Sequence, residues 1–373
     1  MTPDGVRGRR TGGSGPSVVL AVDSGGSGLR VALAAHGMAG DARSPVRQGA
    51  APPAPPTPLS DTLSSEEPVR TGPRGISAGH LLDQLLPMAR RLMAEAGAER
   101  LGAVTIGAAG LATLGDELRA ELPTALEREL GVRRLALAAD AVTAYTGALG
   151  PRAGAVIAAG TGMIAIGTDL TTWRRADGWG HLLGDCGGGA WIGRAGLEAA
   201  LRAFDGRAGG STALLARAEE MFGPMPGLPG RLYPRTDRAA VLASFAPEVA
   251  THAGSDPVAA DILRASARHM AESAAAACPP DGEPHLAFTG GLFKMGAPLL
   301  VPLREELAER LPHAREVPAA GDPLDGALRI AADLADGRLA LPRDERMLYL
   351  VAERSYPEID DQNSPQDRQV REY

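Results

Sequence analysis

Two glycine-rich turns, each set between two apolar runs, most constrain what this chain can fold into. The first lies in VDSGGSGLR at residues 22–30, and the second lies in AAGTGMIAIG at residues 158–167. The flanking runs have strand length and β-branched or aliphatic side chains, so each segment predicts a strand–turn–strand unit. Helices and strands alternate after each unit. The sequence therefore predicts an α/β chain made of two similar domains with a cleft between them.

The predicted elements place the domain boundaries along the 373 residues, a length that suits two domains. We expect a disordered tail at 1–16, a first domain at 17–148 with a Pro-rich insertion at about 50–73, a second domain at 149–340, and a C-terminal tail at 341–373. Apolar spacing predicts helices at 81–92, 117–130, 190–204, 212–221, 238–251, 257–277, 300–310 and 325–335. A helix at 322–337 is expected to pack back on the first domain.

Composition narrows the classes of partner. The net charge is −7 and basic residues form no extended block, which excludes an electrostatic nucleic-acid surface. The apolar runs are too short to span a bilayer. Cys186 and Cys278 are the two cysteines, which is too few for a disulfide framework or a metal cluster. We therefore expect a cytoplasmic protein with no membrane or nucleic-acid partner.

Asp140 lies in AADAVTAYTGA, between a predicted strand and a predicted helix. An Asp at this position is most often an N-cap. A carboxylate at the carboxyl end of a strand also points into the crevice where α/β proteins bind ligands. There it could act as a general base on a hydroxyl group that attacks a phosphate.

Three further segments carry polar or flexible residues. DGWGHLLGDCGGGAWIG, at residues 177–193, holds Asp185 as an acceptor for sugar hydroxyls and Trp179 as an apolar face, with His181 expected to be a core histidine bonded to backbone. FTGGLFKMG, at residues 288–296, offers a flat glycine pair for a nucleoside. Asp23 could hold Mg²⁺ through water, and each glycine turn is a candidate phosphate loop. Taken alone, each segment is also consistent with an ordinary turn.

Together these motifs, with GAAGLA at residues 107–112, resemble the N-acetylglucosamine kinase branch of the actin-like ATPase superfamily, which is grouped with the BadF/BadG/BcrA/BcrD-type ATPases. The resemblance covers residues 18–335, and GWGHLLGD is its most specific part. It implies two ribonuclease-H-like domains that close on ATP, Mg²⁺ and a small-molecule sugar. Homodimers are usual in that family.

The resemblance also implies a role for each site residue. Asp140 is the catalytic base. The residues implied to bind ATP are Asp23, Gly25, Gly26 and Ser27 in the first phosphate loop, Gly160, Thr161 and Gly162 in the second, and Gly290 and Gly291 beside the adenosine, with Asp23 as the metal ligand. The residues implied to line the sugar are Gly178, Trp179, Gly180 and Asp185.

Three positions depart from the family pattern. Cys186 replaces a Glu after the sugar-binding Asp, Met163 replaces a Ser beside the phosphates or the sugar, and residues 72–80 lack an expected Asn. The predicted function is an ATP-dependent amino-sugar kinase that makes N-acetylglucosamine 6-phosphate. A glucosamine or N-acetylmuramic acid kinase, an activase of a reductase with an iron–sulfur cluster, and a non-catalytic sugar or nucleotide sensor remain as alternatives.

Overall fold

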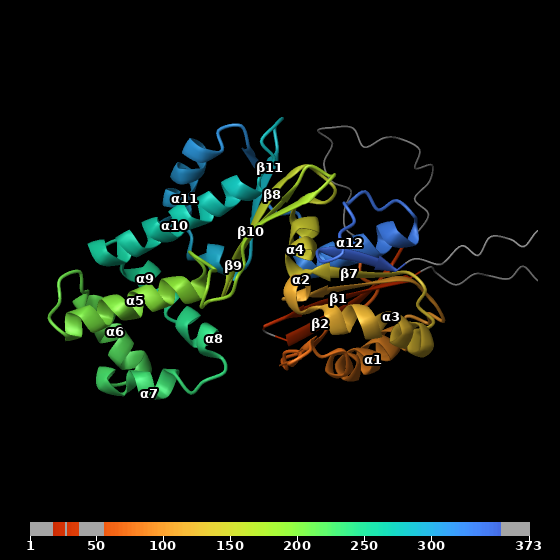
Figure 1. Cartoon of the computed structure of the whole chain (residues 1–373), viewed down its shortest axis with the longest axis horizontal. Helices are drawn as coiled ribbons and strands as arrows, with labels where there is room; N and C mark the ends of the chain where they lie inside the picture. Colours follow the sequence, from red (N-terminus) through yellow and green to blue (C-terminus); the bar gives the residue numbers. More distant parts are fainter. Residues whose placement is uncertain (1–17, 27, 37–55, 352–373) are drawn as a thin grey trace, which may run out of the picture.

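Two β-sheets and a helix pair that lies against them organise the computed structural model, which describes residues 18–26, 28–36 and 56–351 (Figure 1). In the first sheet the strand order is β13–β7–β6–β1–β2–β3. Its strands are β1 (Val18–Gly25), β2 (Gly28–Ala35), β3 (Leu63–Ser65), β6 (Leu101–Ala108), β7 (Leu135–Ala139) and β13 (Leu348–Val351). β1 pairs antiparallel with β2 and parallel with β6, and β6 pairs parallel with β7. The carboxyl ends of β1, β6 and β7 therefore meet at one edge of the sheet.

The pattern of β1 explains why both faces of this sheet are covered. Val18, Leu20 and Val22 join the core cluster that includes α1 (Ala78–Glu95) and α3 (Asp116–Leu130). Val19 and Ala21 alternate with them and join the cluster that includes α4 (Asp140–Leu149) and α12 (Pro323–Ala335). A strand with an unbroken apolar run, such as residues 18–22 of β1, is typical of a sheet buried on both faces.

The second sheet has the strand order β10–β9–β8–β11–β12. Its strands are β8 (Gly154–Ala159), β9 (Met163–Thr168), β10 (Trp173–Asp177), β11 (His285–Thr289) and β12 (Arg315–Glu316). β8 and β9 are antiparallel around the second glycine turn, and β8 pairs parallel with β11. One face packs on α4 through Val156 and Ile166, so α4 contacts both sheets.

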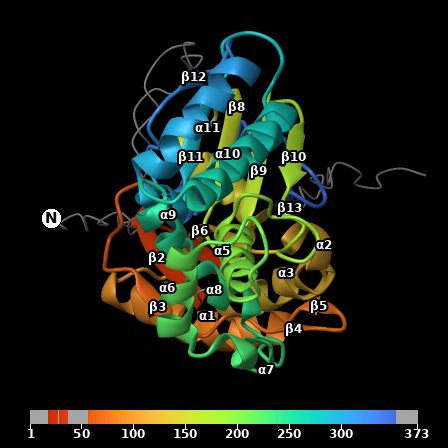
Figure 2. The same ribbon diagram turned by 90° about the vertical axis from the view of Figure 1, so that its left-hand side faces the viewer.

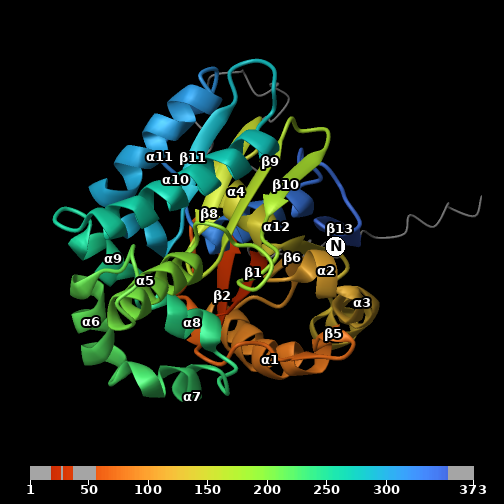
Figure 3. The ribbon, with the colours of Figure 1, turned by 60° about the vertical axis from the view of Figure 1, so that its left-hand side comes forward.

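The helices and 3₁₀ turns of this half share one hydrophobic core, in which α10 packs on the other face of the second sheet (Figure 2). They are α5 (Gly189–Phe204), α6 (Thr212–Phe222), the 3₁₀ turn η1 (Met225–Gly227), α7 (Leu228–Leu232), α8 (Arg238–Ala243), α9 (Ala246–His252), α10 (Pro257–Ala277), the 3₁₀ turn η2 (Gly291–Met295) and α11 (Ala297–Arg310). Asp256 caps α10 through the N–H groups of Val258 and Ala259, as its position before Pro257 favours. α10 and α11 run side by side over the sheet (Figure 3).

Some elements differ from the sequence prediction. The single helix expected at 238–251 is two helices, α8 and α9, and the second has Pro247 in its first turn, where a missing N–H costs nothing. Pro87 lies inside helix α1. Among the short strands that were not predicted, β3 lies inside the expected Pro-rich insertion, β10 follows the second hairpin, and β13 adds to the first sheet from residues expected to be tail. The remaining short elements are β4 (Thr71–Gly72), β5 (Gly75–Ile76) and α2 (Leu111–Leu114).

Two glycines allow α4 and α12 to lie in contact. A Cβ on Gly326 of α12 would stand 1.9 Å from the carbonyl oxygen of Thr143, and one on Gly147 of α4 would stand 2.0 Å from that of Asp322. Real Cβ atoms do not approach that closely, so only glycine fits at either position. Among the residues that the structure describes, no helix is both long and apolar enough to cross a membrane.

Candidate active site

Asp140 lies where the two sheets come together. The five residues of β7 are buried, and the chain turns into α4 at Asp140. The carboxylate opens on a small pocket of about 50 Å³. Residues from both sheets line it: Gly110, Ala112, Thr113, Ala139, Asp140, Ala141, Ile164, Arg175, Gly178 and Met347. The volume suits one or two waters, or the reacting end of a ligand, but not a whole sugar.

The environment of Asp140 favours a proton acceptor. Burial raises the pKa of its carboxyl from 3.8 to about 6; the charge of Asp23 adds to the rise and the charge of Arg175 opposes it. Oδ1 accepts one hydrogen bond, from the N–H of Ala141 at 2.9 Å. A carboxyl with a pKa near 6 is ionised at neutral pH and can still take a proton in a reaction.

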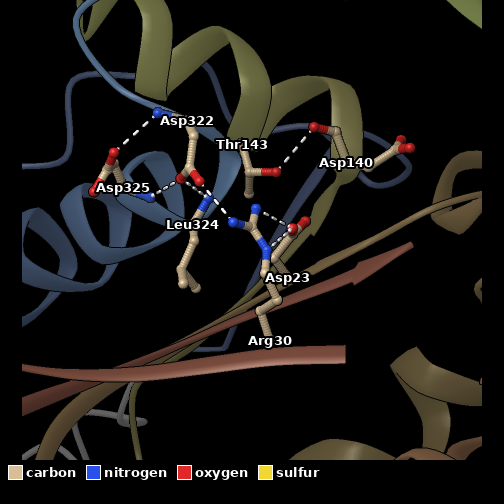
Figure 4. Close-up of polar contacts among 7 residues, drawn as sticks. All are labelled: Asp23, Arg30, Asp140, Thr143, Asp322, Leu324 and Asp325. Carbon is tan, nitrogen blue, oxygen red and sulfur yellow. Dashed lines mark hydrogen bonds and ion pairs between the residues drawn. The ribbon is translucent and has the colours of Figure 1, made fainter. Parts of the chain in front are cut away.

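The N-cap alternative for Asp140 does not describe the structure. The N-cap of α4 is Ala139, and no side chain makes a capping hydrogen bond there. Asp140 is the first residue of the helix, and its backbone carbonyl accepts from the Thr143 hydroxyl at 2.9 Å. Figure 4 shows the carboxylate pointing away from the neighbouring polar cluster. The side chain is therefore left available to the pocket.

Arg30 lies at the centre of the polar cluster that it forms with Asp23 and Asp322. Its role there was not predicted. Its Nη2 and Nε atoms donate to Asp23 Oδ2 at 2.6 and 3.1 Å, and its Nη1 donates to Asp322 Oδ2 at 2.6 Å (Figure 4). Asp322 in turn caps α12 in a capping box with Asp325. Arg30 therefore ties the first glycine hairpin to the start of α12. The hairpin register could have suggested the first contact, since Asp23 and Arg30 lie directly opposite each other.

Asp23 keeps one oxygen for another ligand. Arg30 contacts Oδ2 only, and Oδ1 has no hydrogen-bond partner among the described residues. The same residues contain no group of three side chains that could hold a metal ion. The donor set thus fits Mg²⁺ in its usual form, held mainly by waters and substrate phosphates with one protein carboxylate nearby.

A second and larger pocket, of about 810 Å³, lies on the helical side of the second sheet. Its size is in the range of nucleotide sites. It is lined by Gly160, Thr161, Gly189, Ala243, Pro247, Ala250, Thr251, Gly291, Leu292, Lys294, Met295 and Pro298. Three of these, Gly160, Thr161 and Gly291, were predicted to bind ATP. The walls from α8, α9 and η2 were not, because apolar residues in helices give no sequence signal for a ligand.

The predicted ATP-binding glycines divide into two groups. A Cβ on Gly25, Gly26, Gly160 or Gly291 would meet no atom within 4 Å, so the space above each is open to a ligand. Gly162 and Gly290 are required by the fold itself: a Cβ would lie 2.3 Å from Asp185 Oδ2 and 2.1 Å from the carbonyl oxygen of Ala159. Ser27 lies outside the described residues.

The loop after β10 is held by its own carboxylates. Asp177 Oδ1 and Oδ2 accept from the N–H groups of Asp185 at 2.6 Å and Cys186 at 2.9 Å. Asp185 Oδ1 accepts from the N–H of Gly180 at 2.9 Å. Burial raises the pKa of the Asp185 carboxyl, and the charge of Asp177 raises it further. The Asp177 anchor was not predicted.

Of the four predicted sugar residues, only Gly178 lines the Asp140 pocket. Trp179 is 62% exposed, and Asp185 faces Gly162 of the second glycine turn. The buried Nε2 of His181 has no hydrogen-bond partner in the part of the chain that the structure describes.

Met163 and Cys186, the two residues that replace family residues, lie in different environments. The expectation that Met163 faces the phosphates or the sugar is wrong: this side chain is buried in the core with α5 and α10. A strand alternates its faces, and at this position the side chain points inward. Cys186 stays at the loop, partly buried, and burial with the nearby Asp177 raises the pKa of its thiol.

Fold and site together define an actin-like ATPase: two ribonuclease-H-like units, each opened by a glycine hairpin, with a nucleotide-sized pocket beside the second hairpin. The chain belongs to the BadF/BadG/BcrA/BcrD ATPase family, whose sequence profile matches residues 75–331, well over half of its length. The predicted family and fold class are therefore confirmed.

Individual relatives agree with this assignment. An N-acetylmuramic acid/N-acetylglucosamine kinase from Clostridium acetobutylicum is 35% identical over 111 residues, which are 29% of this chain and 35% of that protein. This chain thus spans about a third of the curated relative. A proposed N-acetylglucosamine kinase from Chromobacterium violaceum superposes with a TM-score of 0.61 at 25% identity, over 85% of this chain and 99% of the other. A Streptomyces griseus glucokinase of the ROK family, solved with glucose and AMPPNP, shares the fold with a TM-score of 0.50 at 20% identity, over 86% and 100% of the two chains.

Proposed function

We propose that this chain is an ATP-dependent sugar kinase, a phosphotransferase that acts on an alcohol group of an amino sugar. The observation that carries the proposal is Asp140, a partly buried carboxyl with a pKa of about 6, in a small pocket that residues of both sheets line. The larger pocket beside Gly160 and Thr161 would take ATP. The family and the names of its relatives support this reading.

In the proposed reaction Asp140 accepts the proton of the sugar hydroxyl. The hydroxyl oxygen forms a bond to the γ-phosphorus, and the bond from that phosphorus to the β–γ bridging oxygen breaks to release ADP. Gly25, Gly26 and Gly160 leave room for the phosphates to lie against the backbone. When bound, Mg²⁺ would neutralise charge on the phosphates, and Asp23 Oδ1 is the oxygen free to hold one of its waters.

The proposed substrate is N-acetylglucosamine, phosphorylated at its 6-hydroxyl. Support comes from the GWGHLLGD segment, whose Gly178 shares the pocket with Asp140, and from the names of the relatives. Glucosamine and N-acetylmuramic acid remain candidates, because Cys186 in the loop after β10 and the Asn missing from residues 72–80 change the polar groups expected around a sugar. Each hydrogen bond lost from a sugar is worth about 0.5–1.5 kcal/mol.

The activase alternative is weakened by the cysteines. Cys278 is 3% exposed and lies in the core of the second sheet, away from any surface where it could ligate a shared iron–sulfur cluster. The proposed compartment remains the cytoplasm, where ATP and Mg²⁺ are supplied, and a homodimer remains the proposed assembly.

A coupled ATP/Mg²⁺ assay tests the function. The panel is N-acetylglucosamine, glucosamine, N-acetylmuramic acid, N-acetylmannosamine and glucose, with Asp140→Asn and the matched control Asp261→Asn, whose carboxylate lies exposed on α10. We expect turnover of one amino sugar, a loss of at least about a hundredfold in Asp140→Asn, and unchanged activity in the control. Tight binding of ATP or a sugar without turnover of any sugar would contradict the kinase proposal and favour the non-catalytic sensor.

A further inference from the structure

Arg175, on strand β10, makes contacts that no sequence motif predicted. Its Nε donates to the backbone carbonyl of Asp177 at 3.0 Å, and its Nη2 donates to that of Gly178 at 2.8 Å. Its guanidinium carbon lies 4.3 Å from the ring centroid of Trp179. Three consecutive residues of the GWGHLLGD region are thus held by one side chain, by two hydrogen bonds and a cation–π contact.

The backbone from Asp177 to Gly180 has a conformation that side-chain contacts must hold in place. Asp177, Gly178 and Gly180 all have left-handed φ values, of 61°, 75° and 85°. A left-handed Asp is strained relative to the usual backbone regions, and it persists only where surrounding contacts fix it. The Asp177 carboxylate fixes the far end of the loop through the N–H groups of Asp185 and Cys186, and Arg175 fixes the near end.

Arg175 also lines the Asp140 pocket, together with Gly178. The charged groups around Asp140 are Asp23 on β1, which raises the pKa of Asp140, and Arg175 on β10, which lowers it. Arg175 also lowers the pKa of Asp185. One cation therefore acts both on the proposed base and on the loop beside it.

We propose that Arg175 is a positioning residue of the active site, which sets the conformation of the Gly178–Gly180 backbone and of Trp179 relative to Asp140. This inference rests on the proposed function, and it adds a residue that the family motif does not contain. The role requires arginine, because only the planar fork can reach two carbonyls and stack on a ring at once. A lysine would keep the charge and lose the geometry.

Arg174 provides a matched control. It precedes Arg175 on the same strand, and successive side chains of a strand point to opposite faces. Its charge acts on Cys278, not on Asp140. Arg174→Lys and Arg174→Gln should therefore leave the kinetics within about twofold of the parent enzyme, whereas the same changes at Arg175 should not.

The kinetic arm compares Arg175→Lys with Arg175→Gln on the full-length enzyme. We expect both to raise the KM for the sugar by about tenfold or more, the loss of roughly one or two hydrogen bonds from the loop, and to leave the KM for ATP within about twofold. Arg175→Gln alone should also move the acid limb of the kcat/KM profile to higher pH, since it removes the cation that favours ionised Asp140. Unchanged sugar KM in both variants would overturn the proposal.

A second arm does not depend on turnover. The chain has three tryptophans, so the fluorescence of Trp179 is isolated by subtracting the spectrum of the matching Trp179→Phe variant. We expect both Arg175 variants to change the emission maximum and the acrylamide quenching of Trp179, and both Arg174 variants to preserve them. If the parent enzyme phosphorylates no sugar, the kinase assignment fails, but the fluorescence measurement still tests whether Arg175 positions Trp179. An unchanged Trp179 signal in folded Arg175→Lys would show that the contact positions nothing.

Discussion

Asp140 shows how one residue can serve a reaction at the expense of the fold. Its pKa rises on folding, to about 6, because burial disfavours the charged form. A carboxyl whose pKa is raised by folding destabilises the folded state at every pH above its unfolded value, and the full effect is present above the folded pKa. At neutral pH the ionised carboxylate of Asp140 therefore lowers the stability of the folded protein.

We predict that Asp140→Asn stabilises the protein while it abolishes turnover. The free energy of unfolding at pH 7.5 should rise by about 1–3 kcal/mol, since a shift from 3.8 to about 6 corresponds to about 3 kcal/mol at most. The gain should shrink between pH 6 and pH 4, where the native carboxyl becomes protonated. Urea unfolding of both proteins at pH 7.5 and pH 4.5 measures it. A destabilised Asp140→Asn would instead indicate that the carboxylate is mainly structural.

Lys294 gives a chemical test of the nucleotide pocket. It is the only lysine among the 38 lysines and arginines of the chain, and the only charged residue among those that line the 810 Å³ pocket. The periodate-oxidised 2′,3′-dialdehyde of ATP forms an imine with a lysine amine, with loss of water, and cyanoborohydride reduces the imine to a stable amine. We expect peptide mapping to find one internal label, at Lys294, and excess ATP to prevent it.

Lys294→Arg is the control for that label. It should remove the internal modification and leave only the N-terminal amine to react. Lys294→Gln should raise the KM for ATP by several-fold without changing the KM for the sugar, because the two pockets share no lining residue. Labelling that excess ATP does not reduce would place the nucleotide elsewhere.

At the residue scale, sequence reasoning found the groups that local chemistry marks. Asp140 at a strand end and the glycines of two hairpins stand out because few other residues suit those positions. Arg30 and Arg175 did not, because an arginine on a strand has no distinguishing pattern until the fold brings Asp322 or Gly178 beside it. Met163 was misplaced because the resemblance identifies the residue that follows the glycine turn but not the face of the strand on which its side chain lies.

At the scale of elements, the pair α4 and α12 holds the centre of the molecule. The two helices come from segments far apart in the chain, and Gly147 and Gly326 let them touch through backbone atoms. Long elements with a clear apolar period, such as α10 and β1, were predictable from sequence alone. The short edge strands β3, β10 and β13 were not, because a segment of so few residues forms a strand only when a neighbouring strand offers its edge.

We predict that Gly326→Ala destabilises the fold by about 2 kcal/mol or more, because the new Cβ would stand 1.9 Å from the carbonyl oxygen of Thr143 and must displace a helix. Gly147→Ala should behave alike. Gly79→Ala in α1 is the control: its Cβ would meet no atom within 4 Å, so helix propensity should make it neutral or stabilising by up to about 1 kcal/mol. Equal melting temperatures for Gly326→Ala and Gly79→Ala would contradict the close packing.

At the scale of the whole molecule, the two pockets belong to different parts of the fold. The larger pocket is built from the second glycine turn and the helices on the outer face of the second sheet, whereas the Asp140 pocket draws its walls from both sheets. The repeat of a glycine hairpin predicted two similar units. A helix at 322–337 was expected to pack back on the first domain, and α12 contacts β1 and β6 of the first sheet. The close pairing of α12 with α4 was not predicted, since it depends on how the two helices meet in the folded chain.

The size of the Asp140 pocket predicts movement on substrate binding. A volume of about 50 Å³ admits the reacting end of a sugar at most, so the walls at Gly110–Thr113 and at the loop after β10 must part or close around the rest of the ring. Sugar should therefore slow amide hydrogen exchange in residues 110–114 and 178–185. The non-hydrolysable ATP analogue alone should slow exchange in residues 246–252 and 291–298, around the other pocket. Exchange measured with each ligand separately, and then with both, separates the two sites. If sugar protected only the residues around the larger pocket, its binding site would lie there and Asp140 could not be its base.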